Sequence, residues 1–369
     1  MRLTLLTSSR ADYGIYLPLL RQLQKDPFFE IAIIAFGTHL SSVHGYTLNQ
    51  ILADGFTVAH TIESLVLDDS PEAIATSMGL TTLKFAKLWA GLQDKTDLVV
   101  CLGDRFEMFA AVSASIPFNI RIAHFYGGET TLGAIDNKFR HAITQMAKYH
   151  FTATTQYADK VAQMTGSPQH IYTVGSLSLD SLQTMILLNA DEFLHRYGID
   201  MRIPTVLVTF HPETVSATQN EVYTDELINA LSSIDQQIVI TMPNADTMGN
   251  MVRNQLSAFA QQHPKRVYIV ENFGTLGYFS CMELCSFLLG NTSSGIIEAA
   301  SFGKYVINIG NRQQGRACSD NVLQVPIIAS EILTAMAHIS ELPPFKGENI
   351  YRQTNVSEKV AGILKTLTD

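Results

Sequence analysis

Short apolar runs alternate with longer segments of mixed polarity along most of the chain, and this pattern predicts strands that are each followed by a helix. In the first half, the runs predict strands at 3–6, 31–36, 58–61, 97–101, 120–123 and 149–152. Helices are predicted at 16–24, at 47–53, from Ser70-Pro71-Glu72 onward, up to Ile116, around Arg140 and His141, and at 156–164. Strands that are apolar along nearly their whole length are typical of a parallel sheet covered by helices on both faces.

The alternation restarts after residues 173–180, which predicts a second sheet of the same kind. Strands are expected at 205–209, 237–241, 266–270, 287–289 and 305–309, and helices at 224–233, 247–262, 276–285 and 358–367. A single core rarely grows beyond ~250–300 residues, so a chain of 369 residues favours two domains. We therefore expect an α/β fold with two Rossmann-like doubly wound parallel-sheet domains, residues 1–175 and 176–350, that face a cleft. A last helix within 351–369 could pack back on the first domain.

Composition narrows the classes of partner. Hydrophobic residues make up 46% of the chain and charged residues only 16%, and the net charge of −9 comes without an acidic tail or a basic patch. Nucleic acid is therefore not expected as a partner, and an anionic ligand must be held by local donors. No run of ~18 apolar residues occurs, and the apolar run near the N-terminus is too short for a signal peptide. These features predict a cytoplasmic protein without a membrane partner.

The four cysteines show no pattern of metal ligation or redox pairing. Cys281 and Cys285 lie one helical turn apart, but no nearby histidine or further cysteine accompanies them, so packing is the favoured explanation. A reducing compartment is expected, and no metal site is predicted.

The stretch from 287 to 316 combines two features that suit an anion. An apolar run ends at Gly290, and Asn291-Thr292-Ser293-Ser294-Gly295 then opens an amphipathic segment with Glu298 one turn further on. Such a turn gathers hydroxyls and backbone N–H groups at the positive end of a helix, which binds phosphate well. A second strand leads to a glycine-flanked loop with Arg312 and Arg316. The alternative is that Ser-Ser-Gly only caps the helix and that the arginines are solvated.

Other unusual polar residues also follow predicted strands directly. They are Arg10 and Asp12, Asp104 and Arg105, His124 through Glu129, His211-Pro212-Glu213, Pro243-Asn244, Thr292 through Ser294, and Arg312. Ligands of open α/β sheets bind beyond the carboxyl ends of the strands, so this distribution predicts a binding region. Carboxylates for proton transfer, with an arginine and hydroxyls for a pyrophosphate, suit a nucleotide sugar. Neither GxGxxG after a strand nor a P-loop sequence is present, which disfavours a tightly held dinucleotide or ATP.

Each candidate also has a structural explanation, and these alternatives stay open at this point. They are a carbonyl partner for Arg10, a helix cap with a local ion pair for Asp104 and Arg105, a solubilising role in a glycine loop for Glu129, an N-cap for Asp136, and an incidental histidine at a helix start for His211. Chance would scatter such residues, whereas here they recur after strands, which favours the functional explanation.

Seven motifs occur in an order that resembles the hydrolysing UDP-N-acetylglucosamine 2-epimerases. They are SRADYG at 9–14, GDRFE at 103–107, HFYGGE at 124–129, IDNKFRHAIT at 135–144, FHPET at 210–214, GNTSSG at 290–295 and GNRQQGR at 310–316. The match runs in order from residue 1 to about residue 325, and as a set it is specific.

The resemblance implies a glycosyltransferase-B-like architecture, no metal or nicotinamide cofactor, and a two-step reaction. UDP would be eliminated to leave a 2-acetamidoglycal, and water would then add to give free N-acetylmannosamine, a sialic acid precursor. Carried over by position, the resemblance assigns Asp104 and Asp136 to catalysis, His211 to the phosphates and Glu298 to the ribose hydroxyls. The other residues expected to contact the nucleotide are Arg10, Arg105, Asn244, Thr292, Ser293 and Arg312.

One position departs from some members of that family, which have a glutamate where this chain has Tyr126. A tyrosine is a poor base near neutral pH, because its reference pKa is ~10. We therefore expect Glu129 or Asp136 to take the role of the missing carboxylate. The predicted catalytic set is then Asp104, Glu129, Asp136 and His211.

The resemblance leaves the sugar open. Similar enzymes act on UDP-2,4-diacetamido-2,4,6-trideoxyglucose in legionaminic acid synthesis, and UDP-N-acetylglucosamine is favoured here over that substrate. The rival functions are a glycosyltransferase of the same architecture, a non-hydrolysing epimerase and a non-catalytic nucleotide-sugar sensor. Dimers or tetramers are common in the family, so a homodimer or homotetramer is expected.

Overall fold

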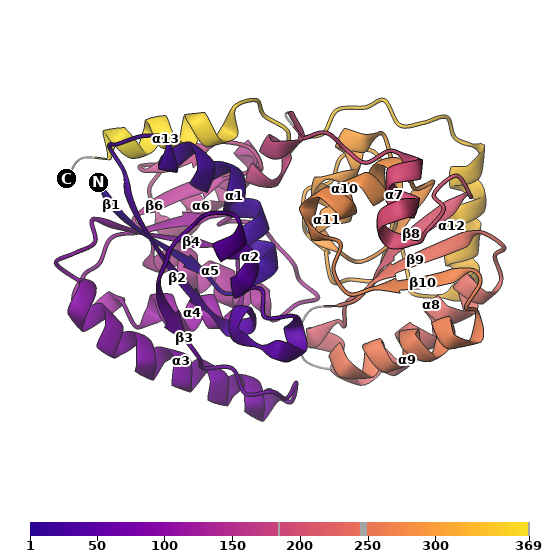
Figure 1. Cartoon of the computed structure of the whole chain (residues 1–369), viewed down its shortest axis with the longest axis horizontal. Coiled ribbons are helices and arrows are strands. Elements are labelled where there is room, and N and C mark those ends of the chain that lie inside the picture. Colours follow the sequence, from indigo (N-terminus) through magenta and orange to yellow (C-terminus); the bar gives the residue numbers. More distant parts are fainter. Residues whose placement is uncertain (184, 244–248, 368–369) are drawn as a thin grey trace. The chain divides into compact units, whose positions relative to one another are not determined.

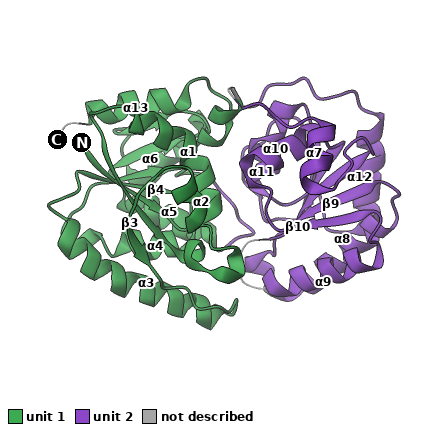
Figure 2. Ribbon diagram, viewed as in Figure 1, with its two compact units in different colours: residues 1–129, 135–183, 351–369 green, residues 130–134, 184–350 purple. Residues whose placement is uncertain are grey.

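The chain forms two compact units, shown in different colours in Figure 2. The computed structural model describes residues 1–183, 185–243 and 249–367. Unit 1 contains residues 1–129, 135–183 and 351–369, and unit 2 contains residues 130–134 and 184–350. A five-residue segment from the first half of the chain, Thr130–Ala134, therefore belongs to unit 2.

Unit 1 is built on a seven-stranded parallel sheet with the strand order β3-β2-β1-β4-β5-β6-β7. Its strands are β1 (Arg2–Thr7), β2 (Glu30–Phe36), β3 (Val58–Ile62), β4 (Leu98–Leu102), β5 (Ile122–Phe125), β6 (Tyr149–Thr152) and β7 (Ile171–Thr173). The central strand β1 pairs with β2 through Leu5 and Ile33 and with β4 through Leu5 and Val100. The chain adds strands on one side of β1 and then on the other, so the direction of winding reverses between β1 and β4.

The helices of unit 1 cover both faces of this sheet. They are α1 (Arg10–Gln24), α2 (Leu48–Ala53), α3 (Pro71–Leu92), α4 (Phe106–Ser113), α5 (Asp136–Met146), α6 (Thr155–Thr165) and α13 (Val356–Thr366), with short 3₁₀ turns η1 (Gly37–Leu40), η2 (Ser42–His44), η3 (Ile116–Phe118) and η4 (Leu177–Gln183). Helix α3 packs against α4, and α4 packs against α5. Helix α13, from the far end of the sequence, packs beside α1 (Figure 1).

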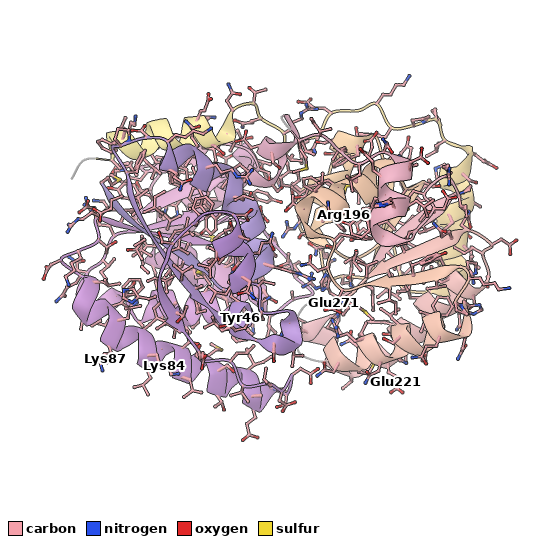
Figure 3. All side chains as sticks on the ribbon, in the orientation of Figure 1. Tyr46, Lys84, Lys87, Arg196, Glu221 and Glu271 are labelled. Carbon is pink, nitrogen blue, oxygen red and sulfur yellow. The ribbon has the colours of Figure 1, made fainter. Side chains whose placement is uncertain are left out.

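Helix α3 shows how an amphipathic pattern selects its buried face. Phe85 and Trp89 lie one turn apart and are fully buried in the core that α3 and α4 share with the sheet. The indole N–H of Trp89 donates a hydrogen bond of 2.9 Å to the carbonyl of Ala111 on α4, so the buried polar atom is satisfied. Lys84 and Lys87 are exposed on the opposite side of the helix (Figure 3).

Unit 2 contains a six-stranded parallel sheet with the order β10-β9-β8-β11-β12-β13. The strands are β8 (Thr205–Thr209), β9 (Gln237–Thr241), β10 (Val267–Val270), β11 (Phe287–Gly290), β12 (Val306–Ile309) and β13 (Val322–Val325). Its helices are α7 (Ala190–Tyr197), α8 (Asn220–Ser232), α9 (Gly249–Gln262), α10 (Gly274–Leu284), α11 (Ser293–Ile297) and α12 (Ala329–Glu341), with 3₁₀ turns η5 (Thr214–Gln219) and η6 (Ala299–Phe302). The winding reverses between β8 and β11.

Successive residues of β8 face opposite sides of the sheet and enter two separate cores. Val206 and Val208 pack with residues of α8, α9 and α12, whereas Leu207 packs with residues of α7 and α10. All five residues of β8 are buried, which explains why the strand reads as a continuous apolar run between two threonines. Packing on both faces of the sheet fixes the carboxyl end of β8, which His211 follows.

The prediction of two doubly wound parallel sheets is confirmed. Strands were predicted at the observed residues for β6, β8 and β9. The sequence pattern missed β7, α7, β13 and α12. Helix α7 carried a usable signal, because Asn189 and Glu192 form a capping box at its start. Strands β7 and β13 are short and only partly buried, so their apolar pattern is weak.

Candidate functional site

The predicted site residues gather at the two points where the winding of a sheet reverses. In unit 1, Arg10 follows β1, and Asp104 and Arg105 follow β4. In unit 2, His211 follows β8, and Thr292 and Ser293 follow β11. Such reversal points are where ligands of doubly wound folds bind.

In unit 1, the turn after β1 is organised by Asp12. Its Oδ2 accepts hydrogen bonds from the backbone N–H of Ser8 at 2.9 Å and from that of Ser9 at 3.1 Å, and its Oδ1 accepts one from the Ser9 hydroxyl at 2.6 Å. Ser9 and Asp12 thereby form a capping box at the start of α1. Asp12 therefore has a structural role, and Arg10 becomes the first residue of α1.

Arg105 is held by a buried carboxylate. Its Nε and Nη2 donate to the two oxygens of Glu107 at 3.1 Å and 2.9 Å, a bidentate ion pair in which Glu107 is 1% exposed. Burial raises the pKa of the Glu107 carboxyl, and the charge of Arg105 opposes that rise. Glu107 thus positions the guanidinium at the end of β4, a function that sequence analysis did not assign although Glu107 lies in the GDRFE motif.

Asp104 forms an ion pair with Arg140, which lies on α5. Arg140 is 3% exposed and lies one turn after Asp136. The pair therefore ties the carboxyl end of β4 to the first turn of α5. Asp136 is the first helical residue of α5, whose N-cap is Ile135, so the N-cap alternative for Asp136 is wrong. The structure brings Asp104 and the helix start of Asp136 to one corner of unit 1.

Glu129 is 2% exposed, so it does not solubilise a surface loop. Its backbone carbonyl lies 3.3 Å from Nε2 of His141, which is on the same helix as Arg140. Burial lowers the pKa of His141, and the nearby charge of Lys160 adds to this. Glu129 is therefore a buried carboxylate at the same corner of unit 1, next to a helix that carries cationic and neutral donors.

Tyr126 points into a structural network. Its hydroxyl lies 3.0 Å from the Ser176 hydroxyl and accepts a hydrogen bond of 2.9 Å from the backbone N–H of Leu177. Tyr126 also adopts a φ of 64°, a left-handed conformation that is uncommon for a large side chain. These contacts fix the phenol to the segment that leaves unit 1. The Tyr126 hydroxyl is therefore hydrogen-bonded within unit 1.

In unit 2, three loops are joined through side-chain amides. The side-chain amide of Asn291 forms hydrogen bonds with both backbone groups of His211. Its Oδ1 accepts from the His211 N–H at 2.7 Å, and its Nδ2 donates to the His211 carbonyl at 2.8 Å. Gln313 Nε2 donates in turn to the Asn291 carbonyl at 2.8 Å. Asn291 and Gln313 are both buried. The backbone at His211 is thus fixed by the loops that follow β11 and β12.

Glu213 fixes the backbone at Arg312. Its Oε1 accepts hydrogen bonds from the N–H of Asn311 at 2.5 Å and from that of Arg312 at 3.2 Å, and the side chain is 1% exposed. Burial raises the pKa of Glu213, and the two N–H donors and the charge of Arg312 oppose the rise. Oε2 is buried and has no hydrogen-bond partner in the part of the chain that the structure describes. A carboxylate therefore sits behind the loop that carries Arg312.

The turn after β11 begins at Gly290, where a side chain has no room. Gly290 has a φ of 142°, and a Cβ there would lie 1.9 Å from the carbonyl oxygen of Thr209. Thr292 is the N-cap of α11, and its Oγ1 accepts from the N–H of Ser294 at 3.4 Å. The close approach of β11 to β8 therefore depends on glycine.

The helix that follows is shorter than expected. Helix α11 has only five residues, and Glu298 is its C-cap and not a residue within a longer helix. The dipole of so short a helix contributes little, so an anion at this turn would depend mainly on individual N–H and hydroxyl donors. Glu298 is buried beside this turn. Asn244 lies outside the described residues.

Within the described residues, no group of three or more histidine, cysteine, aspartate or glutamate side chains is arranged to hold a metal ion. Over the same residues, no helix is long and apolar enough to cross a membrane. All four cysteines are free, and Cys281 and Cys285 are buried in the α10 side of the unit 2 core, as packing predicts.

The chain is similar to known proteins in sequence and in fold. A family model described as UDP-N-acetylglucosamine 2-epimerase matches residues 21–365. The chain is 33% identical to the UDP-N,N'-diacetylbacillosamine 2-epimerase (hydrolyzing) of Legionella pneumophila over 98% of this chain and 94% of that protein. It is 32% identical to polysialic acid biosynthesis protein P7 of Escherichia coli over 89% of this chain and 83% of that protein.

The structure also resembles a solved enzyme. UDP-GlcNAc 2-epimerase from Neisseria meningitidis, bound to UDP-GlcNAc, matches 99% of this chain and 100% of its own with a TM-score of 0.79 at 16% identity. At that identity the likeness shows the fold alone. It agrees with the two parallel sheets, and the predicted fold class is confirmed.

Proposed function

Because the chain belongs to the UDP-N-acetylglucosamine 2-epimerase family, we propose that it is a hydrolysing 2-epimerase of a UDP-linked 2-acetamido sugar. The observation that carries the proposal is its 33% identity, over almost the whole chain, to an enzyme of that reaction type. Unit 2 would bind the nucleotide, and unit 1 would supply the carboxylates that act on the sugar.

The first step would be elimination of UDP. Glu129 would take the proton from carbon 2 of the sugar, the electrons would form the double bond between carbons 1 and 2, and the bond from carbon 1 to the phosphate oxygen would break with its electron pair leaving on UDP. Asp104, held by Arg140, and Asp136 would serve the proton transfers of the second step. In that step water adds to carbon 1 and a proton returns to carbon 2 on the opposite face, which inverts carbon 2.

Departure of UDP requires its developing negative charge to be stabilised. Arg312 and His211 would supply this, because fixed donors act without reorganising at the moment of reaction. Both have backbones held by buried side chains, Glu213 in one case and Asn291 in the other. Thr292 and Ser293 would add hydroxyl and N–H donors, and Glu298 would hold the ribose hydroxyls. Arg10 and Arg105 would complete the contacts from unit 1.

The identity of the sugar in the UDP-sugar substrate is a separate part of the proposal. N,N'-Diacetylbacillosamine is the 2,4-diacetamido-2,4,6-trideoxy sugar, and the relative named for it matches 98% of this chain. We therefore place the 2,4-diacetamido substrate first, although the sequence alone favoured N-acetylglucosamine. N-Acetylglucosamine remains the second candidate, because the relative named for polysialic acid biosynthesis is 32% identical.

The test is proton NMR of the purified protein in deuterated water with each UDP-sugar alone. The proposal expects free 2-epimerised sugar that carries deuterium at carbon 2, together with an equal amount of UDP, from one of the two sugars. A returned UDP-sugar epimer would indicate a non-hydrolysing epimerase. Binding without any product, or product only after an acceptor is added, would replace the proposal with a sensor or a glycosyltransferase.

A further inference from the structure

A short strap connects the predicted carboxylates to the loop of Arg312. We define the strap as Thr130–Ala134, which follows Glu129 directly and ends two residues before Asp136. Its contacts place it in unit 2, although the residues on both sides of it belong to unit 1. The pattern of apolar and polar residues predicts no helix or strand in this segment.

Two backbone hydrogen bonds hold the strap within unit 2. The N–H of Leu132 donates to the carbonyl of Gln314 at 3.0 Å, and the N–H of Val215 donates to the carbonyl of Gly133 at 3.4 Å. Gln314 belongs to the loop after β12, and Val215 follows Glu213 in the loop after β8. The strap is therefore bonded to the same two loops that present Arg312 and His211.

Gly133 packs closely against the backbone of the Arg312 loop. A Cβ on Gly133 would lie 2.5 Å from the carbonyl carbon and oxygen of Asn311 and 2.6 Å from Cα of Arg312. These are backbone atoms, which cannot swing aside as a flexible side chain could. The position requires glycine because of this contact, and any added side chain must move either the strap or the Arg312 loop.

The Arg312 loop is fixed from within unit 2. Glu213 holds the N–H groups of Asn311 and Arg312, and Gln313 is bonded to Asn291. An added methyl group at Gly133 should therefore displace the strap, and with it the chain that carries Glu129 and Asp136.

We propose that Gly133 is a positioning residue: its close packing against the Arg312 loop fixes the strap, from which the chain runs directly to Glu129 and Asp136. Occupation of the Arg312 loop by a nucleoside diphosphate would then be transmitted to these carboxylates through the strap. This inference rests on the proposed function. Gly133 contacts no reacting atom in the proposed reaction. It acts through the position of the strap. Chemistry should therefore depend on Gly133 much more than binding of the nucleotide does.

The test compares Gly133→Ala with Gly91→Ala, which adds the same methyl group on α3 where no atom lies within 4 Å. Three quantities are measured: kcat and KM with the active UDP-sugar, the Kd of UDP by calorimetry, and hydrogen exchange of the peptide that covers 130–134 with and without UDP. Displacement of reacting groups by about 1 Å can lower turnover on the order of 100-fold.

Gly133→Ala should lower kcat by about that factor while the Kd of UDP changes by less than roughly 3-fold. UDP should slow exchange of the strap in the wild type and not in Gly133→Ala, and Gly91→Ala should match the wild type in every measurement. A kcat within about 3-fold of wild type would overturn the inference. A fall in UDP affinity equal to the fall in kcat would also overturn it, because Gly133 would then only support the Arg312 loop.

Hydrogen exchange keeps the test decisive if Gly133→Ala does not fold. In that case the wild type alone decides: slower exchange of the strap with UDP supports the inference, and unchanged exchange with UDP bound overturns it. Different results would reject the proposed function and the inference about the strap. A wild type that does not bind UDP would remove the proposed function and the inference together, whereas UDP binding without an effect on the strap removes only the inference.

Discussion

The carboxylate of Glu213 accepts a hydrogen bond from the backbone N–H of Arg312 at 3.2 Å, although the two residues lie 99 positions apart. The same oxygen accepts from the N–H of Asn311. Two successive backbone N–H groups of this kind form a concave anion site, and here a buried side chain occupies it. The loop after β12 is thus shaped from behind by an internal anion.

Removal of this carboxylate should weaken nucleotide binding. Glu213→Ala leaves two N–H groups without their acceptor, and hydrogen bonds to a charged group contribute about 1.5–3 kcal/mol, so the Kd of UDP should rise by roughly 10- to 100-fold. Glu213→Gln keeps an acceptor oxygen and should change the Kd by only a few-fold. Calorimetric titration of UDP measures both.

A matched control is Glu226→Ala. Glu226 also accepts a backbone hydrogen bond, from the N–H of Ala329 at 2.6 Å, but at the start of α12. UDP affinity should not change in this variant. Equal losses in Glu213→Ala and Glu226→Ala would show that the loss comes from general destabilisation of unit 2.

Asp104→Asn should separate chemistry from folding. The amide keeps the volume of the side chain and an acceptor for Arg140 but cannot take a proton, so kcat should fall by on the order of 10²–10⁴ while the Kd of UDP stays within a few-fold. Asp97→Asn is the control, because Asp97 pairs with Arg2 at the opposite end of the same strand, β4. That partly exposed pair should contribute at most ~1 kcal/mol to stability and nothing to kcat. A kcat for Asp104→Asn near that of the wild type would exclude Asp104 from proton transfer.

The order of the sheets and the positions of most strands could be predicted because buried parallel strands are apolar along their length. The start of helix α3 could also be predicted, because Ser70 and Pro71 are typical of the first positions of a helix. Ion-pair partners could not be predicted in the same way. Asp104 and Arg105 are adjacent in the sequence, yet Asp104 pairs with Arg140, which lies 36 positions further on, and Arg105 pairs with Glu107.

The contacts of the strap with unit 2 also could not be predicted from the sequence. Nothing in the residues TTLGA indicates that they belong to unit 2, since backbone hydrogen bonds, which any residue can make, take part in holding them there. Glu213 stood within a recognised motif, but its role depends on the loop after β12, which only the fold brings near. The candidate residues could thus be named from their positions after strands, whereas the residues that hold them required the structure.

Tyr126 and Glu129 should give opposite results on substitution. Glu129→Gln removes the proposed base, so turnover should be lost while UDP still binds, with a Kd within a few-fold of the wild-type value. Tyr126→Phe removes the partner of the Leu177 N–H and of the Ser176 hydroxyl, and an unsatisfied buried group costs about 1–3 kcal/mol. Tyr126→Phe should therefore lower the urea midpoint of unfolding but keep most of kcat. Full activity in Glu129→Gln would remove it from the proposed role and leave Asp136 as the candidate.

Acid should destabilise the fold through histidines that are buried in their neutral form. His124 is fully buried, its Nε2 lies 2.8 Å from the Gly103 carbonyl, and burial lowers its pKa to about 3. His150, its neighbour on β6, has a pKa of about 4, also because of burial. In the unfolded chain a histidine has a pKa of ~6.5. Between these values the unfolded state binds more protons than the folded state, so stability is present above pH ~6.5 and falls as the pH decreases.

The contribution of His124 can be isolated with His124→Gln, whose amide can donate to the same carbonyl but does not titrate. Each histidine that is protonated only on unfolding adds about 1.4 kcal/mol per pH unit to the slope of stability against pH. Between pH 4 and 6 the free energy of unfolding should therefore depend on pH less steeply in His124→Gln than in the wild type, by about that amount. Urea titrations at a series of pH values measure the slope, and any constant cost of the substitution cancels in the comparison. Identical slopes would mean that His124 becomes protonated in the folded protein over this range, and that its burial does not keep it neutral.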